Sequence, residues 1–479
     1  MDILLATINA KWIHPSLALR LLKANLGPLE NSCDIIEFAL RQPMKEKTDP
    51  ILTAKPQILG LSVSIWNHTA TLELLEELHK TWDTHEAEQP RPVIVLGGPE
   101  VSYLPPEAKL FQYADYCVLG EGENAFRELC EKILTGENLR YPAQTVFLNR
   151  EFQPVNTAHI HSGYGLYTDE DLQKKLIYVE TSRSCPFACA FCLSAHSGKM
   201  RKFPLETFFA EMDGLIQRGA KTIKFLDRTF NFDIGRAQHI MEYFLIKITG
   251  QNHPIVVHFE MVPSRFPPEL IKTIARFPPG TLRLEIGIQT LNPGVSARIG
   301  RPSNPEQELT AIRLLREKTN AIIHADLIAG LPGEDMISFG KGFDLLADAI
   351  NTTCAGPDYE IQLGILKLLP GAPIARLTDE FGMCYNSVPP YEVLATTAIP
   401  ANDINRLKNF ARFWELIVNR KLADMGPPPS GGAPPVFDRF MTFSDALFFR
   451  FNRNWGIPKD QLLAAIQDYK FGELQEKLV

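Results

Sequence analysis

The stretch Cys185-Pro-Phe-Ala-Cys189-Ala-Phe191-Cys192 contains three cysteines that are separated by three and then by two residues. It follows a short apolar run, residues 176–179, which is typical of a buried strand, so we expect the cysteines on the loop that leaves the C-terminal end of that strand. Thiolates at this spacing can bind three irons of a 4Fe–4S cluster and leave the fourth iron without a protein ligand. The stretch therefore predicts a metal centre with one reactive iron.

Two other interpretations of these cysteines stay open at this point. They could be buried core residues, or they could be part of a zinc site, for which tetrahedral coordination requires a fourth Cys or His. His196, four residues after Cys192, is the local candidate for that fourth ligand.

The composition is that of a globular protein with about three domains, since the chain has 479 residues, of which 45% are apolar and 22% charged. The net charge of −7 argues against a surface that coats nucleic acid, so we expect no nucleic-acid partner. No run reaches the roughly 18 apolar residues that a membrane span needs. The N-terminus has no basic leader before its apolar stretch, which favours a cytoplasmic protein.

The distribution of the cysteines also favours a cytoplasmic protein. Of the eight cysteines, three are grouped in the stretch above and five are scattered, namely Cys33, Cys117, Cys130, Cys354 and Cys384. This distribution favours a reducing compartment and one metal site over a disulfide framework. It contains no second cysteine group, so an additional cluster with cysteine ligands is not expected.

In residues 1–140, short apolar runs that are typical of strands alternate with segments whose apolar residues recur at helical spacing. The expected strands are 3–8, 35–39, 58–63, 93–96 and 116–119, and the clearest helices are 16–26 and 69–82. This alternation predicts an α/β domain with a doubly wound, Rossmann-like parallel sheet, which binds ligands at the C-terminal ends of its strands.

The rest of the chain predicts a linker and two further domains. Residues 141–175 are expected to be a linker with a short strand at 143–148. Residues 176–376 contain six apolar runs at 176–179, 222–226, 256–261, 282–288, 324–328 and 360–366, which with intervening helices such as 205–218 and 305–318 predict a partial, TIM-like (β/α)6 barrel. Residues 377–479 are expected to be mainly helical, with helices at 401–423, 444–451 and 458–469 and a Pro- and Gly-rich loop at 426–435.

The cysteine spacing, together with Phe191 directly before the last cysteine, resembles the radical S-adenosylmethionine (SAM) enzymes. The resemblance implies that SAM chelates the open iron through its amino and carboxylate groups and is cleaved to a 5'-deoxyadenosyl radical. It also implies that Glu260 receives the SAM amino group, that Gln289 and Arg301 bind the ribose and carboxylate, and that the segment containing Gly330 runs along the adenine. Glu285 is either a further cofactor contact or half of a buried ion pair.

The first domain resembles the cobalamin-binding domain that precedes the barrel in one subclass of these enzymes. The resemblance rests on three segments that follow successive strands and contain Ser62, Ser64 and Asn67; Gly97, Gly98 and Glu100; and Gly120, Glu121 and Gly122. Glycines at a strand end let the backbone approach a flat macrocycle closely. The D-x-H-x-x-G pattern that supplies a histidine to cobalt in many cobalamin proteins is absent, so His14, after the first strand, is either a cobalt ligand or a hydrogen-bonded structural histidine.

By this resemblance, we expect a cobalamin-dependent radical SAM enzyme that methylates an unactivated carbon of a small-molecule or natural-product-like substrate through a 5'-deoxyadenosyl radical and methylcobalamin. A rearrangement, cyclisation or oxidation without net methyl transfer stays open, as does a non-catalytic cobalamin or iron–sulfur sensor. A methylthiotransferase is disfavoured, because Cys33, Cys117 and Cys130 do not match the three N-terminal cysteines of those relatives. The expected cofactors are a 4Fe–4S cluster, SAM and cobalamin, with flavodoxin or ferredoxin as electron donor to a monomeric enzyme.

Asp227 and Arg228 follow the second barrel strand directly. Two adjacent charges at this place are costly to bury unless they bind each other or a ligand. SAM, cobalamin and substrate are all open as that ligand.

Overall fold

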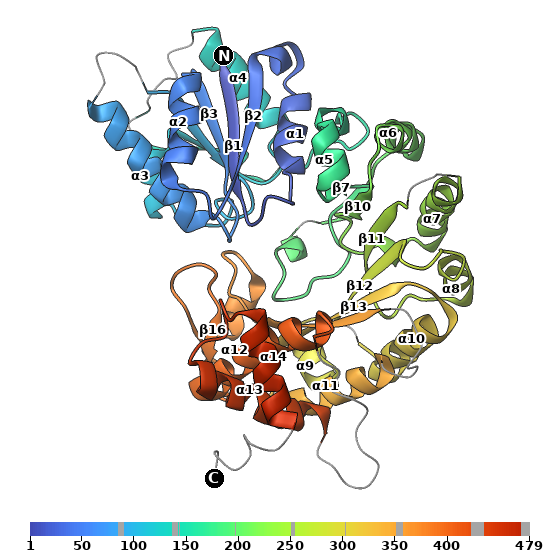
Figure 1. The fold of residues 1–479 in the computed structure, drawn as a ribbon. Helices are drawn as coiled ribbons and strands as arrows, with labels where there is room; N and C mark the ends of the chain where they lie inside the picture. The colour runs from blue at the N-terminus through green and yellow to red at the C-terminus, as the bar shows by residue number, and fades with distance from the viewer. Residues whose placement is uncertain are drawn as a thin grey trace.

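The computed structural model describes residues 1–470 except 85–90, 137–141, 143, 197, 251–253, 302, 351–357 and 423–434. Figure 1 shows three parts along the chain: an N-terminal α/β domain in blue, a curved sheet with helices in green and yellow, and a C-terminal part in orange and red. The first and third parts both lie beside the inner face of the curved sheet. Within the described residues, no helix is both long and apolar enough to span a bilayer.

The first part is a six-stranded parallel sheet in the order β2-β1-β3-β4-β5-β6. Its strands are β1 (Ile3–Asn9), β2 (Cys33–Ala39), β3 (Ile58–Ser62), β4 (Val93–Gly97), β5 (Tyr116–Val118) and β6 (Val146–Leu148). Its helices are α1 (Leu17–Ala24), α2 (Met44–Ala54), α3 (His68–Thr84) and α4 (Glu123–Leu134). β6 falls in the expected linker, but it pairs with β5 and therefore extends this sheet.

Side chains of β1 show why helices cover both faces of this sheet. Successive residues of a strand point to opposite faces. Leu4 packs in one apolar cluster with residues of α2 and α3, whereas Leu5 packs in another with residues of α1 and α4. The doubly wound domain predicted from the sequence is confirmed.

The second part is a six-stranded parallel sheet in the order β14-β13-β12-β11-β10-β7, and β7 and β14 are its two open edges. Its strands are β7 (Ile177–Val179), β10 (Thr222–Phe225), β11 (Val256–Met261), β12 (Leu282–Gln289), β13 (Ile322–Ala329) and β14 (Tyr359–Ile365). Its helices are α5 (Asp169–Lys174), which precedes β7, α6 (Leu205–Gln217), α7 (Ile234–Thr249), α8 (Pro268–Ile274), α9 (Pro293–Arg298), α10 (Pro305–Lys318) and α11 (Met336–Ile350). The six predicted strands and the partial barrel are confirmed.

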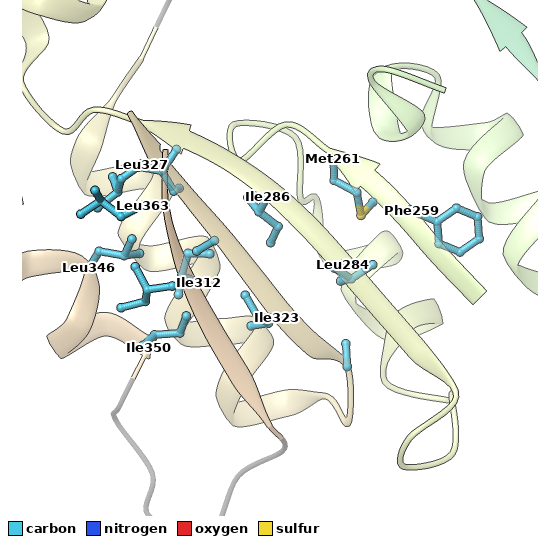
Figure 2. Packing of buried hydrophobic residues seen from close by; sticks show 14 of the residues in the cluster. Phe259, Met261, Leu284, Ile286, Ile312, Ile323, Leu327, Leu346, Ile350 and Leu363 are labelled. Carbon is cyan, nitrogen blue, oxygen red and sulfur yellow. The ribbon is translucent and has the colours of Figure 1, made fainter. Parts of the chain in front are cut away.

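Helices cover the outer face of this sheet through apolar contacts. Figure 2 shows Leu284 and Ile286 of β12 and Ile323 of β13 on the side that faces Ile312 of α10 and Leu346 of α11. All five side chains are fully buried. The alternate residues of the same strands point to the concave inner face, and that face is polar.

The third part is mainly helical, as predicted, but it also contains a small antiparallel pair, β15 (Cys384–Tyr385) and β16 (Val393–Ala395). Its helices are α12 (Ala401–Trp414), α13 (Val436–Phe451) and α14 (Lys459–Lys470). The expected helix 401–423 ends earlier, in a π-helical turn at Glu415–Asn419, and α13 begins eight residues before the expected position 444. The predicted loop 426–435 lies outside the described residues except Pro435.

The helices of the third part share one apolar core with the barrel. Phe410, Phe413 and Trp414 are buried in it, as their aromatic character predicts. Phe449 and Trp455, by contrast, are 74% and 71% exposed and lie outside this core.

Candidate active site

A cavity of about 530 Å³ lies where the C-terminal ends of the first sheet meet the cysteine loop of the second part. Six of the predicted cobalamin contacts line it, namely Ser62, Gly97, Gly98, Gly120, Glu121 and Gly122. Its opposite wall comes from the barrel domain and includes Arg183, Leu193 and Arg228. The cavity therefore lies between the two domains.

The inner end of the cavity is an apolar slot between the sheet and the helices α1 and α4. Leu5, Gly60, Val95 and Phe126 line this end. A Cβ at Gly60 would lie 2.7 Å from the Leu5 side chain and 3.3 Å from Phe126, so a larger residue there would crowd the side chains that line the slot. Pockets of this volume take drug-sized groups. The nucleotide tail of a cobalamin fits the slot, and the glycine-rich strand ends at its mouth suit the corrin.

Three other predicted cobalamin contacts lie outside the wall of this cavity. Asn67 is fully buried, where its side chain donates to the carbonyls of Ile8 and Ser62 and accepts from the amide of Ser64. Asn67 and Ser64 thus connect the ends of β1 and β3. Glu100 accepts hydrogen bonds from Tyr391 of the third part at 2.6 Å and pairs with His68 at 2.7 Å.

His14 contacts the barrel. Its Nδ1 lies 2.8 Å from the hydroxyl of Tyr178, a residue of β7, and burial lowers the pKa of the imidazole. It does not line the cavity described above. His14 is therefore hydrogen-bonded to the barrel, and a role as cobalt ligand stays a prediction.

The three grouped cysteines occupy a loop that starts after β8 (Ser182–Arg183) and ends before β9 (Arg201–Lys202), two short strands that pair antiparallel. Cys189 is buried, and Cys185 and Cys192 are half-buried free thiols. Burial raises the pKa of both Cys185 and Cys189, and the nearby Cys192 thiol acts in the same direction on each. Three thiols in one loop fit three irons of a 4Fe–4S cluster.

His196 and the remaining cysteines are the other possible ligands of this metal centre. Among the described residues, no three His, Cys, Asp or Glu side chains converge as ligands of a single metal ion would. The His196 side chain, the candidate fourth zinc ligand, lies outside the described residues, as does Cys354. Cys33, Cys117 and Cys130 are buried in the apolar clusters of the first domain, where burial raises the pKa of Cys33 and of Cys117 to about 12.

Arg301 and Gln289 lie together beside the cysteine loop. Arg301 donates to the Gly287 carbonyl, and its Nη1 lies 3.8 Å from Cys189 Sγ. Its buried Nε has no hydrogen-bond partner within the described chain. Gln289 ends β12 with a left-handed φ of 70°, so its amide turns back over Gly287. A free guanidinium N–H beside a cluster cysteine fits the carboxylate of SAM.

Glu260, at the inner face of β11, fits the SAM amino group. Its nearest cations are Arg228 at 3.8 Å and Lys224 at 3.9 Å, and it makes no hydrogen bond within the described residues. Burial raises its pKa. A half-buried carboxylate whose nearest cations lie 3.8 Å or more away can accept a further ammonium group.

Glu285 already has partners on the same face. Its Oε2 lies 2.7 Å from Lys224 Nζ and 3.1 Å from His258 Nε2, although the histidine contact is not aligned as a hydrogen bond. Burial acts to raise the pKa of Glu285, but His258 and Lys224 outweigh it and lower the pKa. The buried ion pair is therefore the better description of Glu285.

Two further predicted contacts, Phe191 and Gly330, also pack against neighbouring residues. Phe191 is half-buried against the barrel core. Gly330 lies against the third part, where an added Cβ would lie 2.6 Å from the Val393 side chain.

Asp227 and Arg228 do not bind each other. Asp227 is buried and accepts hydrogen bonds from the Thr181 amide and hydroxyl and from the Ser182 hydroxyl. It thereby fixes the chain that leads into the cysteine loop. Arg228 is exposed on the cavity wall, 3.8 Å from Glu260.

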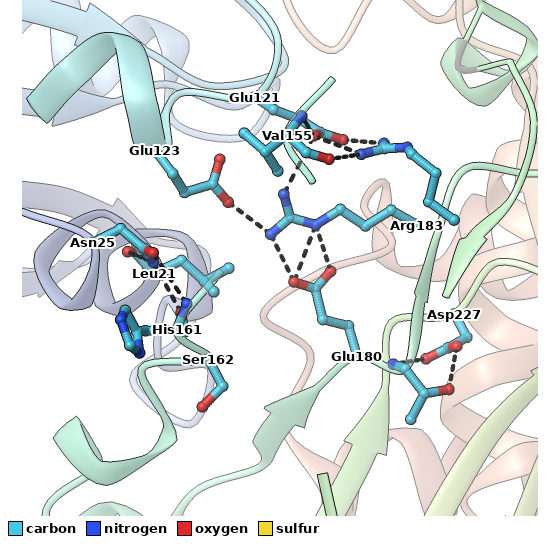
Figure 3. A network of polar contacts seen from close by, with 12 residues as sticks. Leu21, Asn25, Glu121, Glu123, Val155, His161, Ser162, Glu180, Arg183 and Asp227 are labelled. Carbon is cyan, nitrogen blue, oxygen red and sulfur yellow. Dashed lines mark hydrogen bonds and ion pairs between the residues drawn. The ribbon is translucent and has the colours of Figure 1, made fainter. Parts of the chain in front are cut away.

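Several polar residues near the site were not predicted from the sequence. Lys224, His258, His324 and Asp326 point to the concave face of the barrel, where burial and the nearby Glu285 raise the pKa of Asp326 well above its usual range. The detectable signal is the polar residue at every second position of otherwise apolar strands. Figure 3 shows a further group, in which Arg183 connects Glu180 to Glu123 across the domain junction.

The sequence matches the B12 binding domain family over residues 3–130 and the radical SAM superfamily over residues 179–346. A 2-(S-pantetheinyl)-carbapenam-3-carboxylate methyltransferase of Streptantibioticus cattleyicolor is 26% identical over 363 residues, which are 70% of this chain and 50% of that protein. The ribosomal protein uS12 methylthiotransferase RimO of Moorella thermoacetica is 31% identical over 183 residues, or 37% of this chain and 42% of that one. The chain thus spans half or less of the length of these relatives.

The fold also matches a solved structure along its whole length. The radical S-adenosylmethionine methyltransferase TsrM of Kitasatospora setae, with cobalamin and a [4Fe–4S] cluster bound, superposes with a TM-score of 0.62 at 15% identity and covers 100% of both chains. At this identity the likeness concerns the fold alone. The two domains and their order are therefore the same in both chains.

Proposed function

Because this chain belongs to the radical SAM proteins that carry an N-terminal B12-binding domain, we propose that it is a cobalamin-dependent radical SAM enzyme that methylates an unactivated carbon of a small-molecule substrate. Similarity to proteins named as methyltransferases supports methylation over the other reactions of this subclass. Rearrangement, cyclisation and oxidation become outcomes of the test below.

One observation carries this proposal: the 530 Å³ cavity has one wall from the B12-binding domain and one from the cysteine loop and barrel. Arg228 lies on that wall and is also 3.8 Å from Glu260, the proposed partner of the SAM amino group. A substrate at this junction would be close to both cofactors. Such proximity is the main contribution that a protein makes to cofactor chemistry.

When bound, the cluster and SAM supply a radical that abstracts hydrogen, and cobalamin supplies a methyl group. Cys185, Cys189 and Cys192 would hold three irons, Arg301 would bind the SAM carboxylate and Glu260 would bind its amino group. The glycines that end β4 and follow β5 let the backbone approach the corrin. The third part shares the apolar core of the barrel and contacts the first domain through the Tyr391–Glu100 hydrogen bond.

The polar concave face of the barrel suits a small molecule with hydrogen-bonding groups. It presents Lys224, His258, Glu285, His324 and Asp326. Cluster reduction requires a one-electron donor, for which a flavodoxin or ferredoxin of the cytoplasm is the proposed source.

The test uses reconstituted protein with SAM that carries a trideuterated methyl group, a reductant and hydroxocobalamin, incubated with a small-molecule extract of cells that lack the protein. We expect a product with a trideuterated methyl group on carbon, together with S-adenosylhomocysteine and 5'-deoxyadenosine. Formation of 5'-deoxyadenosine and a changed metabolite without the label would indicate a reaction without methyl transfer. Absence of SAM turnover under all conditions would contradict the enzyme proposal and favour a sensor.

A further inference from the structure

Two arginines join the base of the cysteine loop to the first domain. Arg183 of β8 and Arg201 of β9 face each other in the antiparallel pair that closes the loop. Arg183 Nη2 lies 2.7 Å from Glu123 Oε1, and Arg201 Nη1 donates to Glu121 Oε2 at 3.0 Å. Arg183 Nη1 is also 3.4 Å from Glu121. Both strands at the loop base therefore contact the same four-residue segment, 120–123.

The Arg183 guanidinium is held on both sides of the domain junction. On the barrel side it donates from Nε to both oxygens of Glu180 at 3.1 Å and from Nη2 at 2.7 Å. Figure 3 shows the guanidinium between Glu180 and Glu123, with Glu121 above it. Burial would lower the pKa of Arg183, but Glu180 and Glu123 outweigh burial and raise it, so the side chain stays cationic.

These contacts fix the orientation of the Arg183 guanidinium as well as its distance from the carboxylates. Only 11% of the Arg183 side chain is exposed, with 5% for Glu123 and 10% for Glu180. A planar guanidinium that is bound at several nitrogens cannot rotate without breaking hydrogen bonds. Removal of one partner would leave an uncompensated charge in a nearly dry place.

The side chains of Arg183, Arg201, Glu121, Glu123 and Glu180 form a clamp between the two domains. The backbone between this clamp and the first cysteine is strained. Ser184, which separates Arg183 from Cys185, has a left-handed φ of 75°. Residues without a glycine's freedom keep such a conformation only where their surroundings enforce it. Arg183 on one side and the Arg201 contact to Ser184 Oγ at 3.4 Å on the other supply that constraint.

At its other end the clamp contacts the segment that lines the cofactor cavity. Gly120, Glu121 and Gly122 line the cavity, and Glu123 begins α4. Movement of this segment would therefore shift the cavity wall relative to Cys185. Glu121, expected from the sequence to contact cobalamin, lines this cavity while its carboxylate accepts from Arg201 and from the Val155 amide.

We propose that Arg183, supported by Arg201, is a positioning residue that sets the placement of the cluster loop relative to the cobalamin cavity. The inference rests on the proposed function, because it concerns the separation of the two cofactors. Neither arginine is assigned contact with a reacting atom. The clamp acts on Cys185 through Ser184 and on the cavity through Glu121 and Glu123.

The distance between the two paramagnetic cofactors tests this role without any substrate. The sample is full-length protein that contains cob(II)alamin and the reduced cluster, and pulsed electron paramagnetic resonance measures the dipolar coupling between them. We expect one narrow coupling in the wild type and a broad, shifted distribution in Arg183→Gln. Arg183→Lys keeps the charge without the planar fork and should give an intermediate broadening.

Arg20 provides a matched control. It is also a buried arginine between two carboxylates, Glu37 at 3.0 Å and Asp171 at 2.9 Å, and it too links the first domain to the next segment. It does not line the cavity, so Arg20→Gln should keep the wild-type coupling. If Arg183→Gln fails to fold, Glu123→Gln removes the opposite end of the clamp and should broaden the coupling in the same way.

The same samples give a second readout. Displacement of a reactant by about 1 Å can cost about 100-fold in rate. With SAM and reductant, Arg183→Gln should still form 5'-deoxyadenosine at near the wild-type rate, while S-adenosylhomocysteine falls by up to about 100-fold.

The outcomes separate this inference from the proposed function. An unchanged coupling in both Arg183 variants would overturn the positioning role, as would an equal broadening in Arg20→Gln. A wild-type protein that shows no bound cobalamin signal would overturn the proposed function together with this inference.

Discussion

Substitution of Gly98 by alanine should unfold the loop that follows β4 and weaken cobalamin binding. Gly98 has a φ of 105°, which L-residues rarely adopt, and a Cβ there would lie 2.5 Å from the Val63 carbonyl oxygen and 3.0 Å from the Val63 amide nitrogen. These are backbone atoms, and Val63 donates to the Gly97 carbonyl at 2.8 Å, so the loop cannot yield locally. A left-handed alanine costs about 1–2 kcal/mol and overpacking about 1–3 kcal/mol, which together give about 2–5 kcal/mol.

Alanine substitutions at two other glycines distinguish the cost of the backbone conformation from the cost of steric overlap. Gly97→Ala meets only the Val118 carbonyl oxygen at 3.6 Å, an ordinary contact, so its free energy of unfolding should stay within about 1 kcal/mol of the wild type. Gly136 has a φ of 86° but no atom within 4 Å of an added Cβ. Gly136→Ala should therefore cost only the conformational part, about 1–2 kcal/mol.

Urea unfolding of the apo-protein, followed by fluorescence, measures these differences, and spectrophotometric titration with hydroxocobalamin measures affinity. We expect Gly98→Ala to be the least stable of the three variants and to bind cobalamin more weakly than the wild type. Equal unfolding midpoints for Gly98→Ala and Gly97→Ala would refute the close approach of Val63 to the Gly98 backbone.

Three further predictions follow from other residues. Burial raises the pKa of Glu334 from 4.5 to about 7. Because the pKa is higher in the folded than in the unfolded chain, the carboxyl group stabilises the fold fully below about pH 4.5, and this contribution is lost as the pH rises through 7. The loss in the free energy of unfolding is about 3 kcal/mol. Glu334→Gln should therefore be more stable than the wild type to urea at pH 8 and similar to it at pH 4.5. If the free energies of unfolding of the two proteins changed in parallel with pH, this prediction would be contradicted. Cys192→Ala should lose most of its iron on reconstitution and form no 5'-deoxyadenosine, and retention of SAM cleavage would exclude the assigned ligand set. Phe259→Ala should lower the free energy of unfolding by about 3–5 kcal/mol, since Phe259 is fully buried and stacks on Phe230 at 3.9 Å; a loss below about 1 kcal/mol would show that this stack does not support the barrel.

The strands and their parallel order could be predicted because their signals are local. Each barrel strand is a short apolar run between helical segments, and glycines mark the strand ends that line the cavity. The edge strand β6 was placed in the linker, since three residues carry too little periodicity to reveal that they pair with Tyr116–Val118.

Contacts between distant segments could not be predicted. Nothing in the sequence around Arg183 indicates Glu123 as its partner, 60 positions earlier, because ion pairs leave no periodic signal. For the same reason the sequence does not reveal that Glu100 accepts from Tyr391 or that Glu121, in the cavity wall, accepts from Arg201. Asp227 illustrates a related limit, since hydroxyl and amide donors satisfy its buried charge instead of the adjacent arginine.

The stoichiometry of bound cobalamin tests the central claim most directly, namely that the cavity at the domain junction is a cobalamin site next to the cluster loop. The purified chain, with its cluster reconstituted, is incubated with excess hydroxocobalamin and passed through a desalting column, and the retained cofactor is quantified by its absorbance. We expect about one cobalamin per chain. Retention far below one equivalent, from a protein whose iron content shows that the cluster is complete, would contradict it.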